Sequence, residues 1–92
     1  MATQGVGSTL EHDSVLIGAA ASVIKAAKST RKSIVIQNAH ATQILYIGGA
    51  GVTTATGLRV AAGASVTLDD YNGVLYGIAS GANTDVRYLE VS

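Results

Sequence analysis

Apolar and polar residues alternate along several short segments of the chain, and this alternation predicts β-strands. In residues 58–69, Leu58 and Val60 flank Arg59, and the same pattern resumes after a glycine with Val66. Strict alternation marks a strand with one buried face. Similar β-branched or aromatic runs occur in the stretches RKSIVIQN, QILYIGG, YNGVLYGIASG and TDVRYLEV. The pattern predicts six to eight short antiparallel strands that form a single small β-sandwich of the jelly-roll type.

Turn-forming residues separate these runs. Asn38 ends the first clear run, and the dipeptide Asn72-Gly73 is typical of a tight turn. The glycine of the stretch LRVAAGASVTL falls between two alternating runs, which favours a hairpin there. The spacing of these signals is about 8–12 residues, as in other small all-β domains.

The N-terminal third of the chain is less clear. Residues 1–13 are small and polar, so we expect a flexible, extended arm ahead of a sandwich domain over residues 14–92. Residues 14–28 contain both helix-favouring alanines and two clusters of β-branched residues. Periodicity alone does not separate these two structures over so short a segment, although the β pattern downstream favours two strands.

Composition narrows the classes of function. Six basic residues balance six acidic residues, and charged residues make up only 13% of the 92-residue chain. This balance argues against nucleic-acid binding, which needs a clustered positive excess, and it favours association with other proteins. The chain has no cysteine, which excludes disulfides and thiolate metal sites. We expect neither a signal peptide nor a membrane span, because the N-terminus is polar and the apolar runs are short.

The glycine-rich stretch GGAGVTTATG resembles a phosphate-binding loop only superficially. A P-loop needs a Lys-Ser or Lys-Thr pair followed by a helix, and this stretch has neither. We therefore interpret Gly48, Gly49, Gly51 and Gly57 as residues of turns or bulges.

Other candidate chemistry is weak. The tripeptide Glu11-His12-Asp13 and the lone His40 contain metal-ligating side chains without the spacing of a site, and the adjacent Asp69 and Asp70 suit a turn better than acid–base catalysis. We predict no catalytic residues, no metal and no cofactor. Four tyrosines at positions 46, 71, 76 and 88 supply bulk to the core or, alternatively, a surface for stacking sugars.

A longer pattern resembles a known class of protein. The stretches RKSIVIQNAHATQILYIGGAGVTTATGLRVAAGASVTLDD and LYGIASGANTDVRYLEV are similar to small virion proteins of tailed bacteriophages. The likeness covers about the last two thirds of the chain and consists of strand patterns and turn glycines. It implies an all-β module that serves as a head decoration (cement) protein or as a small part of a tail or fibre.

This resemblance implies a structural protein on the outer capsid surface of a virion, made in the host cytoplasm. Its partners would be the major capsid protein and further copies of itself, as a homotrimer. The alternative is a tail or fibre module that binds host carbohydrate through Tyr46, Tyr71 or Tyr76 with Asp69, Asp70 and Asn72. The candidate partner-binding residues belong to the arm and to a basic cluster that also includes Lys32; they are Thr3, Gln4, Val6, Thr9, Leu10, Lys25, Lys28 and Arg31.

Overall fold

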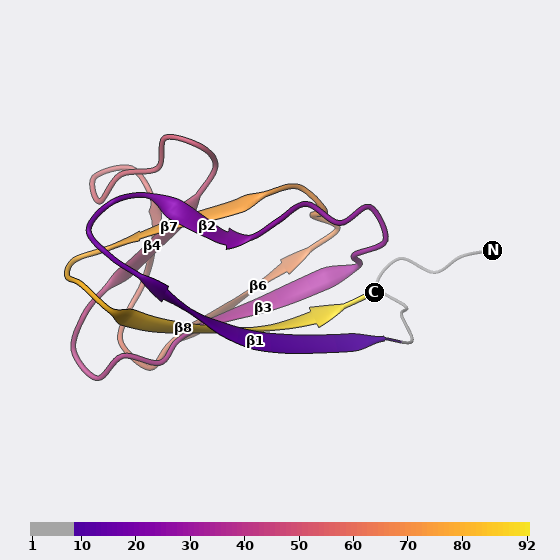
Figure 1. Cartoon of the computed structure of the whole chain (residues 1–92), viewed down its shortest axis with the longest axis horizontal. Coiled ribbons are helices and arrows are strands. Elements are labelled where there is room, and N and C mark those ends of the chain that lie inside the picture. Colours follow the sequence, from indigo (N-terminus) through magenta and orange to yellow (C-terminus); the bar gives the residue numbers. More distant parts are fainter. Residues whose placement is uncertain (1–8) are drawn as a thin grey trace.

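The computed structural model describes residues 9–92, which contain strands and connecting loops but no helix (Figure 1). Eight antiparallel strands form two sheets of four, which confirms the predicted β-sandwich. The strands are β1 (Leu10–Ile17), β2 (Ser22–Lys25), β3 (Ser33–Asn38), β4 (Leu45–Gly48), β5 (Leu58–Val60), β6 (Ser65–Asp69), β7 (Leu75–Ala79) and β8 (Thr84–Val91).

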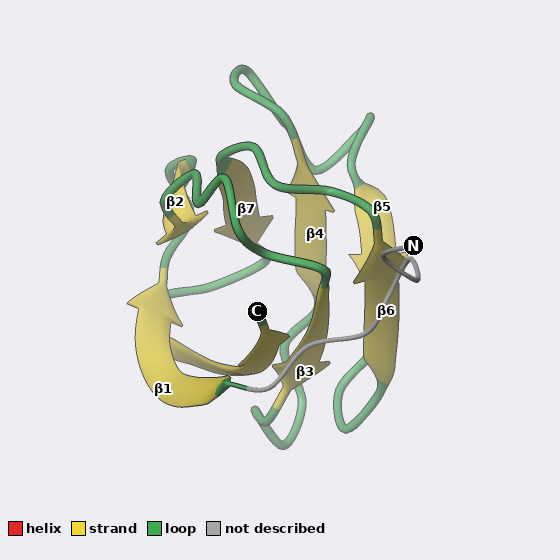
Figure 2. Cartoon of the chain, turned by 90° about the vertical axis from the view of Figure 1, so that its right-hand side faces the viewer, coloured by secondary structure: helices red, strands yellow, loops and turns green. Residues whose placement is uncertain are grey.

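The strand order is that of a jelly roll. Sheet A has the order β1-β8-β3-β6, and sheet B has the order β2-β7-β4-β5. Figure 2 shows β1 and β2 along one side of the sandwich and β5 and β6 along the opposite side. Each of these four strands ends a sheet. The sandwich therefore has two sides on which strand edges have no neighbour among the described residues.

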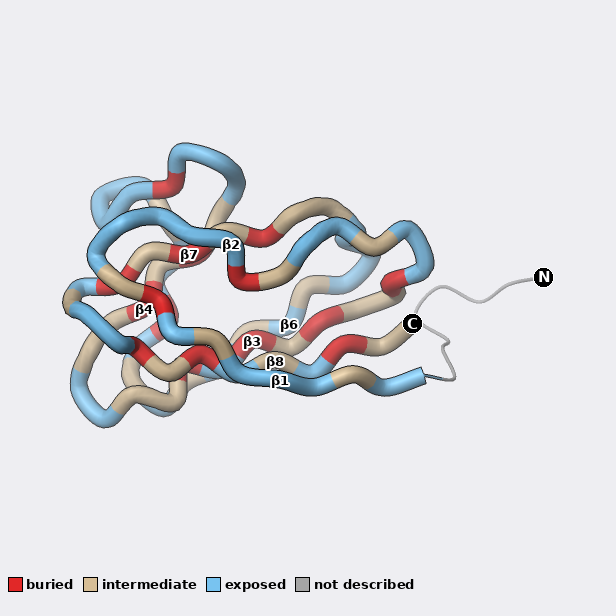
Figure 3. The backbone as a smooth tube through the Cα atoms, in the orientation of Figure 1, coloured by how far each residue is buried: buried red, intermediate tan, exposed pale blue. Residues whose placement is uncertain are grey.

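The core lies between the sheets and consists of aliphatic side chains at alternate strand positions. Figure 3 marks the buried residues in red along the backbone. In β3, for example, Ile34 and Ile36 are fully buried, whereas Val35 between them is only half-buried. Burying one such aliphatic side chain contributes about 1.5–3 kcal/mol. The buried core residues are Ile17, Ile24, Ile34, Ile36, Leu45, Ile47, Val60, Leu75, Ala79 and Val86.

The N-terminal boundary differs from the sequence prediction. Residues 10–13 were assigned to a flexible arm, but they form the first half of β1 and pair with β8 from Leu10↔Val91 to Asp13↔Tyr88. Polar side chains are compatible with this strand because it lies at a sheet edge, where its side chains are mostly exposed. Residues 1–8 of the predicted arm lie outside the described residues. Residues 14–28, for which the sequence left helix and strand open, contain strands: β1 continues to Ile17, and β2 follows it.

The hairpin predicted at Gly63 is wrong, and the segment with the predicted Asn72-Gly73 turn also connects the two sheets. The turn around Gly63 connects β5 in sheet B to β6 in sheet A, and the segment with Asn72-Gly73 connects β6 back to sheet B. Gly63 has a φ of +79°, as a tight turn requires, but in the second segment the positive φ belongs to Asp70, at 62°. Turn residues indicate where the chain reverses, but they do not indicate which sheet the next strand joins.

Asn38 explains why the first clear strand ends where it does. The side chain is fully buried, and its Nδ2 donates hydrogen bonds to the carbonyl oxygens of Gln43 at 2.8 Å and Val60 at 3.0 Å. Its Oδ1 accepts a hydrogen bond from the backbone N–H of His40 at 3.1 Å. One amide thus joins the end of β3 to the next loop and to β5 in the other sheet.

Candidate functional site

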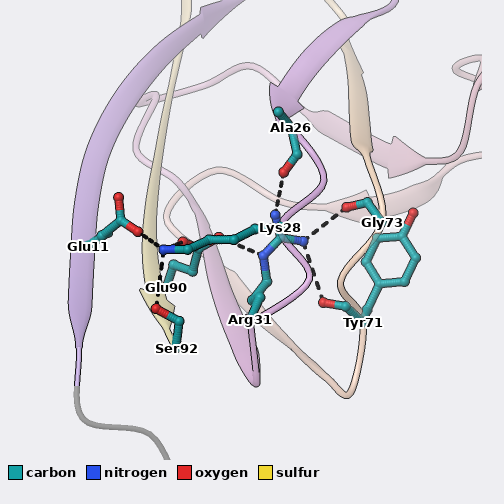
Figure 4. Close-up of polar contacts among 8 residues, drawn as sticks. All are labelled: Glu11, Ala26, Lys28, Arg31, Tyr71, Gly73, Glu90 and Ser92. Carbon is teal, nitrogen blue, oxygen red and sulfur yellow. Dashed lines mark hydrogen bonds and ion pairs between the residues drawn. The ribbon is translucent and has the colours of Figure 1, made fainter.

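A cluster of charged side chains closes the end of the sandwich at which β8 ends (Figure 4). At its centre is Glu90 of β8, whose carboxylate is fully buried. Arg31 Nε donates a hydrogen bond to Glu90 Oε2 at 2.6 Å, and Lys28 Nζ lies 3.2 Å from Glu90 Oε1. Both carboxylate oxygens are therefore paired with a cation, which compensates for the removal of this charge from water.

Lys28 extends the cluster to the first and last parts of the described chain. Its Nζ forms an ion pair with Glu11 of β1 and lies 3.2 Å from Ser92 Oγ. Next to this contact, the backbone groups of Thr9 and Ser92 exchange two hydrogen bonds of 2.9 Å. The start of β1 is therefore held to β8 by both backbone and side-chain contacts.

Arg31 extends the cluster to the two loops beside it. Its guanidinium donates hydrogen bonds to the carbonyl oxygens of Ala26, Tyr71 and Gly73, the last at 3.0 Å. Each loop contributes backbone carbonyls to the same planar guanidinium, whose several N–H groups suit this arrangement. Arg31 thus fixes the β2–β3 connection and the β6–β7 connection relative to β8.

The contacts of Glu90 and Lys28 shift the pKa of each side chain. Burial by itself raises the pKa of Glu90, but the hydrogen bonds from Arg31 and Lys28 outweigh burial, and the net pKa lies below the usual value for glutamate. The pKa of Lys28 is raised, mainly by its hydrogen bond to Glu11. The folded state therefore favours the charged form of both groups.

Sequence reasoning missed Glu90, although a signal was present. The β8 segment alternates, and the positions of Thr84, Val86 and Glu90 share its buried face. A charged residue at an inward-facing strand position needs a partner of opposite charge. The cations that pair with it are 59 and 62 residues away in the chain, so the sequence did not identify them.

The predicted partner-binding residues of the N-terminal segment are divided between three settings. Thr3, Gln4 and Val6 lie outside the described residues. Thr9 is held against Ser92 by its backbone. Leu10 is 64% exposed, so its side chain is accessible from solvent.

The three basic candidates for partner binding each have a contact within the chain. Arg31 is only 3% exposed, and its guanidinium is committed to Glu90 and to backbone carbonyls. Lys28 is committed to Glu11 and Glu90, and Lys25 Nζ lies 5.1 Å from the ring centroid of Tyr88. These side chains are adjacent in sequence, but the fold turns them toward internal partners.

The residues of the carbohydrate hypothesis do not all meet. Alternation places Tyr46 and Tyr76 on the outer face of sheet B, opposite Ile78 and Gly48 respectively. Tyr71 lies in the β6–β7 connection instead, where its hydroxyl donates to the carbonyl oxygen of Val74 at 2.5 Å.

A hollow of about 440 Å³ lies between the edges of the two sheets at β5 and β6. Ile47, Leu68 and Leu75 contribute apolar surface from the core side, and Asp69 lies at the rim on β6. Two exposed side chains complete the hollow, namely Leu58, which is 56% exposed, and Tyr71, which is 38% exposed. Its volume falls within the range of sites that bind small ligands or side chains.

The remaining candidate motifs have local structural partners. Within residues 9–92, no three metal-ligating side chains converge, and Glu11 is paired with Lys28. His40 Nδ1 accepts hydrogen bonds from the backbone N–H groups of Thr42 and Gln43 at 3.0 and 2.9 Å. The same described part of the chain has no helix that could cross a membrane.

The glycine-rich stretch folds back onto sheet B. Val52 is buried there, and Gly57 packs so closely that an added Cβ would lie 2.8 Å from Tyr46 Cβ and from Val52 Cγ2. Gly51 has a φ of +84°, which glycine adopts readily. Gly49, Gly51 and Gly57 therefore lie in the loop between β4 and β5, as predicted. Gly48 is an exception, because it is the last residue of β4 and pairs with Tyr76 of β7.

Comparisons with known proteins give little further guidance. No family model matches the chain, and no curated protein matches it. A solved structure of Bacillus endospore appendages, described as a novel family of disulfide-linked pili, is 17% identical and superimposes with a TM-score of 0.49. The match covers 100% of this chain and 95% of that one. A likeness at this level carries no argument about function.

Proposed function

We propose that the protein is a structural virion protein of a tailed bacteriophage. In this proposal it decorates the outer surface of the capsid, binds the major capsid protein as a homotrimer and stabilises the shell. The sequence resemblance supports the class of protein, and the sandwich is the kind of rigid module that the resemblance implies. The protein would be made in the host cytoplasm and would act without catalysis.

The observation that carries the proposal is an aliphatic patch on the outer face of sheet A. Leu10 lies opposite Val91, and Val35 lies opposite Leu89. Leu89 and Val91 share one face of β8, so the four side chains are neighbours on the surface. Leu10 and Leu89 are 64% and 41% exposed. Contiguous exposed apolar side chains with a polar surround are typical of protein–protein interfaces.

The free edge of β1 lies beside this patch. Thr9 and Ser92 form a hydrogen-bonded pair, because they exchange both backbone hydrogen bonds. In an antiparallel ladder such pairs alternate, so the backbone N–H and C=O groups of odd-numbered residues from Glu11 onward point toward β8. The backbone groups of Leu10, His12 and Leu16 point away from the sheet. Such an edge can pair with a strand of another chain. Asp13 Oδ1 accepts a hydrogen bond from the backbone N–H of Ser14 at 2.8 Å, which occupies one outward-facing donor near the middle of the edge.

The test is binding to empty shells of the source phage that lack the protein. We expect saturable binding and greater resistance of the shells to heat. Leu89→Ser removes one leucine of the patch, whose burial is worth about 1.5–3 kcal/mol, so affinity should fall by about tenfold or more. Val23→Ser, at a 44% exposed position of sheet B, is the matched control and should bind normally. Absence of saturable binding, or equal loss in both variants, would contradict the proposal.

A second candidate is a tail or fibre module that binds host carbohydrate. Tyr46 and Tyr76 lie on the same outer face of sheet B, diagonal to one another in the strand register, and adjacent aromatic rings can stack on sugars. A glycan array distinguishes the two functions. Binding that Tyr76→Ala abolishes would support the carbohydrate function, and no binding across a broad array would argue against it.

A further inference from the structure

The side of the sandwich formed by β5 and β6 combines a free strand edge with an apolar hollow. At the two ends of β6, Ala64 O accepts a hydrogen bond from Asn38 N–H, and Asp70 N–H donates to Lys32 O. Even-numbered residues of this segment therefore face β3. It follows that the backbone N–H and C=O groups of Ser65, Thr67 and Asp69 point away from the sheet. No described strand pairs with this edge.

The hollow begins next to these outward-facing groups. Thr67, Leu68 and Asp69 line it from β6, and Leu58 lines it from β5. β5 has only three residues and begins at Leu58, and the core residues Ile47 and Leu75 line the hollow behind it. An extended chain lying along β6 would therefore have space for one large apolar side chain directly beside its backbone.

Charge further restricts the occupant. Asp69 lies at this hollow and forms no ion pair with any other residue in the range 9–92. A cation on the occupant would complement it. The opposite wall is already fixed in position, because Arg31 donates hydrogen bonds to the carbonyl oxygens of Tyr71 and Gly73. A preformed wall reduces the loss of entropy on binding.

We propose that β6 binds an extended segment of a partner protein as an additional strand. The segment places one bulky apolar side chain in the hollow and a lysine or arginine beside Asp69, and its backbone pairs with Ser65, Thr67 and Asp69. Three consecutive outward-facing backbone positions favour a peptide over a lipid or a sugar, because only a peptide strand matches their spacing. This site is separate from the aliphatic patch of sheet A and does not depend on the proposed capsid function.

The probe is a displayed library of random octapeptides selected against the whole protein. We expect enriched peptides to share a large apolar residue and a nearby basic residue. Bound to the protein, such a peptide should shift the NMR amide signals of Leu58, Thr67 and Asp69, whereas the signal of Val23 on sheet B should not move. Failure to enrich any peptide, or enrichment of peptides without an apolar residue, would overturn the proposal.

Two variants test the binding geometry of an enriched peptide. Thr67→Pro removes an N–H that faces outward, so the β3–β6 ladder keeps its hydrogen bonds and the fold should persist, while affinity falls at least about tenfold. Peptides selected against Asp69→Lys should carry an acidic residue in place of the basic residue that the wild type selects. Unchanged binding of the peptide by Thr67→Pro would contradict strand addition. Displacement of the peptide by a sugar or a detergent, to the same extent from both variants, would also contradict it.

Discussion

At the scale of single residues, two buried polar side chains hold together parts of the chain that are far apart in sequence. Asn38 joins β3 to the next loop and to β5, and Glu90 joins β8 to Lys28 and Arg31. All buried side-chain polar atoms within residues 9–92 have a partner. Since an unpaired buried charge is far more costly than an unpaired surface charge, the Glu90 cluster should be the most sensitive polar site in the fold.

Replacing Glu90 tests this directly. Glu90→Gln leaves Arg31 buried without its counter-ion, and we expect the free energy of unfolding to fall by about 3–5 kcal/mol. The matched control is Asp85→Asn, because Asp85 and Arg87 form an ion pair at 3.1 Å on the surface, which should contribute less than about 1 kcal/mol. Urea unfolding of both variants provides the comparison, and similar losses would show that Glu90 has no special role.

The pH dependence of stability follows from the same residue. The pKa of Glu90 is lower in the folded state than its ordinary value of 4.5, so the ionised form stabilises the fold above that pH. This stabilisation should be lost as the pH falls below about 4.5 toward the folded-state value. Urea unfolding at a series of acidic pH values should give a steeper decline for the wild type than for Glu90→Gln. Parallel curves for the two proteins would be inconsistent with this assignment.

The sequence predicted some residues of this site and misinterpreted their role. It singled out Lys28 and Arg31 as basic, but grouped them with Lys25 and Lys32 because the four are close in sequence. Their actual partner is an inward-facing carboxylate about 60 residues away. Alternation within β8 indicates that Glu90 needs a partner, but only the sheet pairing identifies which cations provide it.

At the scale of elements, strand positions followed from the sequence more closely than sheet assignments did. Alternation of apolar and polar residues is a local property of the sequence, and the runs around Arg59 and Val66 display it clearly. The assignment of β5 and β6 to different sheets depends instead on long-range pairing with β4 and β3. For this reason the turn at Gly63 was predicted correctly as a turn but wrongly as a hairpin.

The glycine-rich loop offers a prediction at this scale. An added Cβ at Gly57 would lie 2.8 Å from Tyr46 Cβ and 3.1 Å from the carbonyl oxygen of Thr53, so the loop must move away from sheet B. We expect Gly57→Ala to lower the free energy of unfolding by about 1–3 kcal/mol. Gly49 has no atom within 4 Å of an added Cβ, so Gly49→Ala should change it by less than about 0.5 kcal/mol. Equal effects of both substitutions would contradict the packing described for this loop.

At the scale of the whole molecule, the features favour repeated association with other proteins. The chain has no net charge and few charged residues. Within residues 9–92, two sides of the sandwich have strand edges without a neighbour, and leucines on β1, β5 and β8 are exposed. Weak contacts of this kind gain strength when many copies bind a symmetric surface together. This is the physical basis of the proposed decoration of a capsid.

Self-association is the first consequence that can be measured. We expect a homotrimer at micromolar concentration, because a threefold arrangement on a shell lets each copy use the same edges and patch. Native mass spectrometry gives the oligomeric state, and Leu89→Ser should shift the population toward monomer if the patch contributes to the trimer. A wild-type protein that stays monomeric at that concentration would argue against the trimer.

The central claim concerns where the protein is found in a virion. Quantitative mass spectrometry of purified particles of the source phage measures its copy number relative to the major capsid protein. The proposal predicts a fixed ratio that matches the symmetry of the capsid lattice, with the same ratio in tailless heads. Absence from the particles, or a small number of copies that is lost when tails are removed, would contradict it.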